Sequence, residues 1–150
     1  MRKKPTEKSK YKSPSTGDYC TCAQYIAEII CTRMSEKDNE GKQSYKFWNT
    51  SKWQKTYQYQ VVLANRLLKK YSEAAVVKAI HSVECRRMYS LRFPPLETII
   101  QKYQKIVDSQ RQAEITIEIK EDAASRKSHG YGKKSALHKL RNLDGKKEDN

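Results

Sequence analysis

Four side chains in this sequence are of types that coordinate zinc: Cys20, Cys22, His81 and Cys85. His81 and Cys85 are four residues apart, so a helix would place them on one face as half of a tetrahedral site. The other half fits less well, because Cys20 and Cys22 would point about 200° apart in a helix and depart from the usual Cys-x2-Cys spacing. We therefore expect the cysteines, Cys31 included, to be small buried or half-buried thiols, with a zinc site as the alternative.

Basic side chains could bind phosphate, because a guanidinium group forms forked hydrogen bonds to phosphate oxygens. Arg86, Arg87 and Arg92 lie close together in the sequence and form a candidate phosphate-binding patch. The other candidates are spread over both ends and the middle of the chain: Lys3, Lys4, Lys46, Lys52, Lys55, Lys133, Lys134, Lys139 and Arg141.

Three aromatic residues, Tyr45, Phe47 and Trp48, lie among lysines in a predicted loop over residues 36–51. An exposed cluster of this kind could stack nucleic-acid bases. We favour a structural interpretation, in which Phe47 and Trp48 cover one end of the helical core, because a small domain uses its large aromatics to close the core.

The sequence contains none of the common catalytic or nucleotide-binding motifs GxxxxGK[ST], GxGxxG, HExxH and GxSxG. Two of its three histidines, His129 and His138, lie in the C-terminal tail. We therefore expect a protein that is not an enzyme and that needs no cofactor. The alternative is a nucleic-acid-processing enzyme whose active-site residues come together only in the fold.

The positive charge of the chain is concentrated at its two ends. Thirty-one Lys and Arg against seventeen Asp and Glu give a formal net charge of +14. Residues 1–16 carry six basic and one acidic residue, and residues 125–150 carry eight and three, so each end is +5, while residues 17–124 carry seventeen and thirteen, or +4. Two basic arms around a mildly basic body suit a protein that binds a polyanion, since each neutralised phosphate releases counterions.

The composition, 37% hydrophobic and 32% charged, is enough for one modest core. No apolar run approaches the ~20 residues needed to cross a membrane, and no apolar segment follows the basic N-terminus as it would in a secretory signal. We expect a cytoplasmic protein, or a nuclear one in a eukaryotic host, with reduced cysteines.

Apolar residues recur every three or four positions in four segments, which predicts helices over about 18–35, 52–70, 73–84 and 96–112. Ser72 is a suitable N-cap for the third helix. The predicted fold class is all-α. It is a compact bundle of about four helices over residues 17–112, with disordered basic arms at 1–16 and 125–150.

The second and third predicted helices are close enough in sequence to form a helix-turn-helix motif. The exposed face of the third helix is poor in Arg, Asn and Gln and carries Glu73 and Glu84. A helix that enters the major groove should be more basic, so we expect an ordinary pair of packed helices.

Isoleucines occupy alternate positions, 115, 117 and 119, in the connecting segment 113–124. Alternation is the period of a strand, but the chain offers no second strand. Three alternatives remain: continuation of the preceding helix, a lone extended segment, or a strand that pairs with a partner. In the tail, a short amphipathic helix over 136–143 would carry partner-docking residues on one side: Leu137, Leu140 and Leu143.

These features predict a nucleic-acid-binding accessory protein that grips phosphates of DNA or RNA through its arms and arginine patch, with low sequence specificity. The alternative is an interaction or assembly subunit of a replication or ribonucleoprotein complex, which docks onto a larger protein through residues 115–119 and 136–143. The two hypotheses are compatible, and neither involves a membrane.

Overall fold

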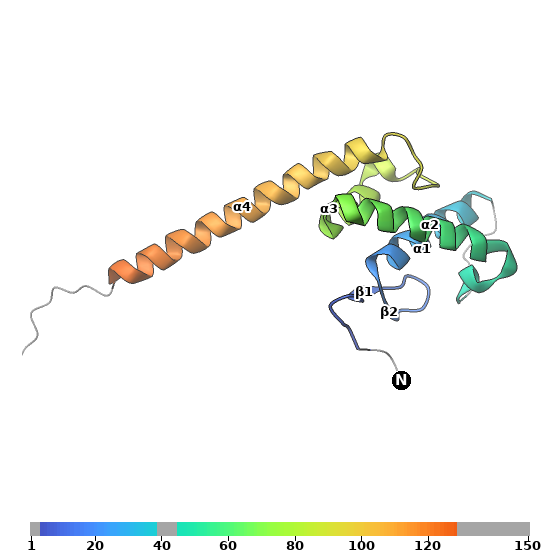
Figure 1. Ribbon diagram of the computed structural model, residues 1–150, viewed down its shortest axis with the longest axis horizontal. Helices are drawn as coiled ribbons and strands as arrows, with labels where there is room; N and C mark the ends of the chain where they lie inside the picture. Colours follow the sequence, from blue (N-terminus) through green and yellow to red (C-terminus); the bar gives the residue numbers. More distant parts are fainter. Residues whose placement is uncertain (1–3, 39–44, 129–150) are drawn as a thin grey trace, which may run out of the picture. The chain divides into compact units, whose positions relative to one another are not determined.

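The computed structural model describes residues 4–38 and 45–128, with side chains as far as residue 124 (Figure 1). Its elements, in chain order, are β1 (Tyr11–Lys12), β2 (Tyr19–Cys20), α1 (Cys22–Lys37), the short 3₁₀ helix η1 (Phe47–Asn49), α2 (Ser51–Lys70), α3 (Glu73–His81), a second 3₁₀ helix η2 (Val83–Cys85) and α4 (Leu96–Ser128). The chain divides into two units, residues 1–110 and residues 111–150. The predicted all-α class is confirmed, since the described part of the chain holds four α-helices and one two-stranded sheet.

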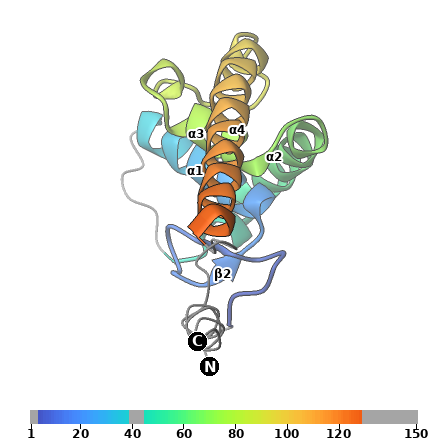
Figure 2. The same cartoon turned by 90° about the vertical axis from the view of Figure 1, so that its left-hand side faces the viewer.

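α1 begins later than predicted, at Cys22, because the residues before it belong to β2. A capping box closes its first turn. The Gln24 N–H donates to Thr21 Oγ1 at 3.3 Å, and the Thr21 N–H donates to Gln24 Oε1 at 3.0 Å. Ile26 and Ile30 are fully buried in the main core, where α1 packs along α2 and also contacts α3 (Figure 2). α1 is therefore the helix around which the first unit is built.

The residues before α1 form a small hairpin where the sequence predicts a disordered arm. β1 pairs with β2 in antiparallel register, Tyr11 opposite Cys20. Gly17 adopts a φ of 70°, a left-handed conformation that glycine reaches without steric cost, and so lets the chain turn between the strands. Contacts of the first unit thus start well before residue 17. The hairpin is not evident from the sequence, because its strands have no alternation of apolar residues and polar groups attach it to α1.

The hairpin is attached to α1 by the carboxylate of Glu28, which is only 2% exposed. The Ser13 hydroxyl donates to Glu28 Oε2 at 2.7 Å, and the Ser15 N–H donates to Glu28 Oε1 at 2.8 Å. The Tyr11 ring adds an apolar contact by stacking on Tyr25, with ring centroids 5.3 Å apart. A buried carboxylate is tolerable here because both of its oxygens accept hydrogen bonds.

α2 and α3 complete the main core. Ala64 and Leu67 of α2 belong to the same buried cluster as Val76 and Ile80 of α3. Ser72 is the N-cap of α3 as predicted, since its hydroxyl accepts from the Ala75 N–H at 3.3 Å. α3 ends at His81, earlier than predicted, and the chain continues into η2.

α4 contributes its first part to the core of the first unit, through Leu96, Ile100 and Val107. The helix does not stop near residue 112 but runs to Ser128, so the segment 113–124 continues the preceding helix and forms no strand. Its strong helix formers, among them three Glu, three Ala and one Lys, outweigh the alternating isoleucines. None of the helices within the described ranges is both long and apolar enough to span a membrane.

Replacing Glu28 with Ala should lower the free energy of unfolding by about 1–3 kcal/mol, because the Ser13 hydroxyl and the Ser15 N–H lose their acceptor. The measurement is the urea midpoint of unfolding, followed by circular dichroism. Glu36→Ala is the matched control, since Glu36 lies exposed near the end of the same helix. Equal midpoints for the two variants would contradict the proposed attachment of the hairpin.

Candidate functional site

α2 has an unusual charge distribution for a surface helix. Its twenty residues contain no Asp or Glu and five basic residues, Lys52, Lys55, Arg66, Lys69 and Lys70. The buried side of the helix is formed by Trp53, Gln60, Ala64 and Leu67. The basic residues therefore lie on the parts of α2 that the core leaves to solvent.

Five exposed residues of α2 follow one another at steps of four, three, four and three positions, which places them on one face. They are Lys55, Tyr59, Val62, Arg66 and Lys69. We call this surface the α2 basic face. From its first to its last residue it extends about 21 Å along the helix axis. The two uncharged members are large and well exposed, Tyr59 at 45% and Val62 at 49%.

The cations of the α2 basic face are available for binding. Lys55, Arg66 and Lys69 form no ion pair or side-chain hydrogen bond with any residue that the structure describes. Lys70, next to this face, is instead paired with Glu97 of α4 at 2.9 Å. Lys52 packs its ammonium over the Trp53 ring, 5.9 Å from the centroid.

The predicted arginine patch lies in the loop between η2 and α4. Arg86, Arg87 and Arg92 are all exposed, and within the described ranges their side chains have no hydrogen-bond or ion-pair partner. The loop itself is anchored, because Met88 is 1% and Leu91 is 6% exposed. The structure thus presents three free guanidinium groups on a loop that is fixed at its apolar residues.

Gln60 of α2 connects this loop to the helix. Its side chain is 2% exposed, and Gln60 Oε1 accepts from the Leu91 N–H at 3.1 Å while its Nε2 donates to Ser90 Oγ at 3.4 Å. The same helix therefore carries the basic face on one side and, on the other, holds the loop that carries Arg86, Arg87 and Arg92.

Arg33 of α1 has a structural role near the start of the same loop. Its guanidinium donates to the carbonyl oxygens of Cys85 at 2.8 Å and Ile80 at 2.9 Å. These carbonyls lie at the C-terminal ends of η2 and α3, where a cation is favourable. Burial lowers the pKa of Arg33, but an arginine remains charged at neutral pH.

The aromatic residues 45, 47 and 48 divide between core and surface. Phe47 is 2% exposed and packs edge-on against Trp53, with ring centroids 5.8 Å apart, as the structural interpretation expects. Trp48 is half-buried and stacks on Tyr57 at 5.7 Å. Tyr45 is 62% exposed, with the Lys46 ammonium 5.0 Å from its ring centroid. Phe47 is therefore unable to stack on a base.

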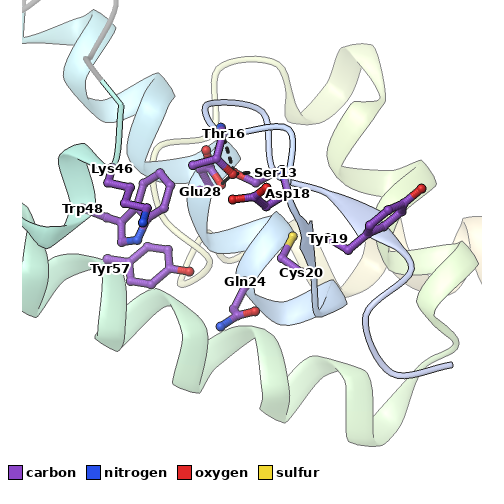
Figure 3. A pocket seen from close by; sticks show the side chains of 10 residues that line it. All are labelled: Ser13, Thr16, Asp18, Tyr19, Cys20, Gln24, Glu28, Lys46, Trp48 and Tyr57. Atoms are coloured by element: carbon purple, nitrogen blue, oxygen red, sulfur yellow. Dashed lines mark hydrogen bonds between the residues drawn. The ribbon is translucent and has the colours of Figure 1, made fainter. Parts of the chain in front are cut away.

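A pocket of about 300 Å³ lies between the hairpin, α1, the segment around η1 and α2. Figure 3 shows Lys46, Trp48 and Tyr57 along one side and the carboxylates of Asp18 and Glu28 facing them. The other residues that line it are Ser13, Thr16, Tyr19, Cys20 and Gln24. No local pattern in the sequence indicates this pocket, because its walls come from segments on both sides of α1.

Lys46 reaches the rim of the pocket with an uncommon backbone conformation. Its φ of 55° and ψ of 38° lie in the left-handed region, which side chains with a Cβ adopt at an energetic cost. Residues in such conformations gather at ligand-binding positions in many proteins.

The candidate zinc ligands Cys20, Cys22, His81 and Cys85 are not brought together. Within the described ranges there is no group of three or more His, Cys, Asp or Glu arranged to hold a metal ion. His81 instead contacts the Tyr25 hydroxyl through Nε2 at 3.0 Å. Burial raises the pKa of Cys20 and of Cys22 to about 11, so these thiols stay protonated at neutral pH.

The remaining predicted site residues fall into two groups. Lys4, Lys46, Lys52 and Lys55 are exposed. Outside the described residues lie one N-terminal lysine and the predicted residues of the tail: Lys3, Lys133, Lys134, Leu137, Lys139, Leu140, Arg141 and Leu143.

Sequence reasoning missed Arg66, Lys69 and Tyr59, although the signal was present. The apolar stripe of α2 predicts only its buried side. The absence of Asp and Glu from 20 successive helical residues is the signal that indicates a basic face on the exposed side. Gln60 and Arg33 had no local signal, because their partners lie 30 and more residues away.

No protein-family model matches this chain, and neither a curated protein nor a solved structure matches it significantly. A fold alone would not identify a function, so the functional argument depends on the chemistry of the surfaces described above.

Replacing Gln60 with Leu should lower the free energy of unfolding by about 1–3 kcal/mol, because the Leu91 N–H loses its acceptor. The measurement is the midpoint of urea denaturation. Gln58→Leu makes the same change at an exposed position of α2 and is the control. If the two variants unfold at the same urea concentration, Gln60 does not hold the loop.

Proposed function

We propose that this protein is a non-enzymatic nucleic-acid-binding accessory protein that grips phosphates with low sequence specificity. The α2 basic face is the main contact surface. The arginine loop (Arg86, Arg87 and Arg92) and the basic ends of the chain add further phosphate contacts. The partner is DNA or RNA, because both present the phosphate backbone that such a surface recognises.

The observation that carries this proposal is the absence of acids from α2 together with three unpaired cations on one face of it. Surface cations of a globular protein are often interspersed with acids, and Lys70 with its partner Glu97 is an example in this chain. Lys55, Arg66 and Lys69 lie on one face with no carboxylate on the helix beside them. When a polyanion binds such a surface, each neutralised phosphate releases its counterions, and no carboxylate of the helix competes for the cations.

The length and composition of the face favour contact with the backbone over readout of bases. A length of about 21 Å along a duplex axis covers roughly six phosphates of each strand, at 3.4 Å of axis per phosphate, so the face can reach several of them. Tyr59 and Val62 between the cations offer apolar contact with sugars and bases, which tolerates different sequences. The formal charge of +14 attracts the polyanion from a distance.

Replacing Lys55, Arg66 and Lys69 together with Ala should weaken binding of a short DNA duplex and flatten its salt dependence. The slope of log affinity against log salt should become less negative by about 2–3, since each lost phosphate contact removes about 0.9. Fluorescence anisotropy at several salt concentrations measures both quantities.

The control for this experiment removes the same total charge from other exposed positions of the first unit. Lys78, Lys102 and Lys105 lie on α3 and α4 and are exposed. Their triple replacement with Ala should leave most of the slope in place. An equal effect of the two triple variants would show that net charge acts alone, and absence of salt-dependent binding by the unmodified protein would refute the proposal.

A second candidate function, an interaction or assembly subunit of a larger complex, is favoured by the second part of α4. Ile115, Ile117 and Ile119 are 48%, 54% and 63% exposed. Ile115 and Ile119 are one helical turn apart and share a face. Exposed isoleucines of this kind suit docking onto the apolar groove of a protein partner, and the predicted docking segment 136–143 lies outside the described residues.

Replacing Ile115 and Ile119 with Asp should release such a protein partner while leaving the first unit folded, because a charged pair would have to enter an apolar interface. Quantitative pull-down from the source cells measures the release. The double variant with Asp at Ala113 and Ala124, two exposed positions on another face of the same helix, is the control. Retention of the partner by the Ile115 and Ile119 variant would count against this candidate.

A further inference from the structure

The pocket between the hairpin and α2 contains hydrogen-bonding groups that the fold leaves unused. The carboxylate of Asp18 accepts no hydrogen bond from the residues that the structure describes. The Tyr57 hydroxyl likewise has no hydrogen-bond partner in this part of the chain. In Figure 3 the hydroxyl end of Tyr57 is directed toward the side of the pocket that carries Asp18 and Cys20.

These groups differ in what they offer to a ligand. The Asp18 carboxylate presents two acceptor oxygens. Burial raises the pKa of Tyr57 to about 12, so its hydroxyl is protonated at neutral pH and can donate. Glu28 shares the pocket, but the Ser13 hydroxyl and the Ser15 N–H already occupy its oxygens. The ligand should therefore present two neighbouring donors and at least one acceptor.

The rest of the pocket selects the size and charge of the ligand. Its volume of about 300 Å³ lies at the small end of the range for ligand sites, which suits one planar ring system. The half-buried Trp48 and Tyr57 rings form an aromatic wall. The Lys46 ammonium, which also lines the pocket, can contact an anionic group on the ligand, and the overall charge of +14 attracts anions from a distance.

We infer that this pocket binds a guanine base, either in a free nucleotide or unpaired within a strand. The Asp18 carboxylate accepts from the N1–H and the N2 amine, which lie side by side on the Watson–Crick edge of guanine. The Tyr57 hydroxyl donates to a ring acceptor, and Lys46 contacts the phosphate. Uracil and thymine lack two adjacent donors. The inference deepens the proposed function and rests on it for the strand-bound case.

The experiment is isothermal titration calorimetry of the full chain with guanosine, adenosine, cytidine, uridine and xanthosine monophosphates. Guanosine monophosphate should bind at least about tenfold more tightly than the uridine nucleotide, because a charged hydrogen-bond acceptor discriminates by that factor or more. Asp18→Asn should lower the affinity for guanosine monophosphate by about tenfold. It should also shift preference toward xanthosine monophosphate, whose C2 carbonyl can accept from the Asn amide. Tyr57→Phe should weaken binding by about threefold or more.

Matched controls separate the pocket from general effects on charge or folding. Asp108→Asn makes the same charge change on α4, and Tyr103→Phe removes a tyrosine hydroxyl outside the pocket. Both should leave affinity for guanosine monophosphate unchanged. If the pocket merely supported the fold, Asp18→Asn would not change the preferred base from guanine to xanthine.

A second experiment measures binding of a single-stranded uridine oligonucleotide that contains one guanosine and compares it with binding of the all-uridine strand. Preference for the guanosine strand, lost in Asp18→Asn, supports the strand-bound case. Preference for the free nucleotide alone supports the mononucleotide case. Equal binding of guanosine and uridine monophosphates, or unchanged guanosine binding by Asp18→Asn, overturns the inference. Loss of oligonucleotide binding on removing Lys55, Arg66 and Lys69 would then still support the proposed function.

Discussion

The buried carboxylate of Glu28 is the contact on which the N-terminal half of the first unit depends. It joins α1 to the hairpin through the Ser13 hydroxyl and the Ser15 N–H. The hairpin has only two residues in each strand, so strand pairing alone would not hold it. Without this attachment, the turn over residues 13–18 would lose its hydrogen bonds to α1, and the pocket wall that contains Asp18 would lose its support.

Two further polar side chains act in the same way elsewhere in the first unit. Arg33 ties α1 to the ends of α3 and η2, and Gln60 ties α2 to the loop that carries the arginines. A core with many Ala and Cys residues supplies limited apolar area. Hydrogen bonds between buried side chains and the main chain therefore fix the segments between the helices, which are also the segments that present the candidate binding groups.

The sequence predicted the helices well, because the apolar side chains of α1, α2, α3 and the first part of α4 recur at helical spacing. It also predicted the Ser72 cap and the burial of Phe47. It did not predict the hairpin, Arg33 or Gln60, because each is defined by a partner distant in sequence. The pocket has no local signal for the same reason, whereas the α2 basic face does have one, since the 20 residues of α2 contain no Asp or Glu.

The charge pattern of α2 has a consequence for the stability of the helix itself. Lys52 and Lys55 lie in and near its first turn, where the partial positive charge of the helix dipole disfavours cations. The helix also has no acid for an i to i+4 ion pair. The first turns of α2 therefore carry an electrostatic cost that Lys69 and Lys70 in its last turn do not, and the packing of Trp53, Ala64 and Leu67 must overcome it. The polyanion that we propose as the partner would offset this cost, and its binding would then be coupled to the stability of the helix.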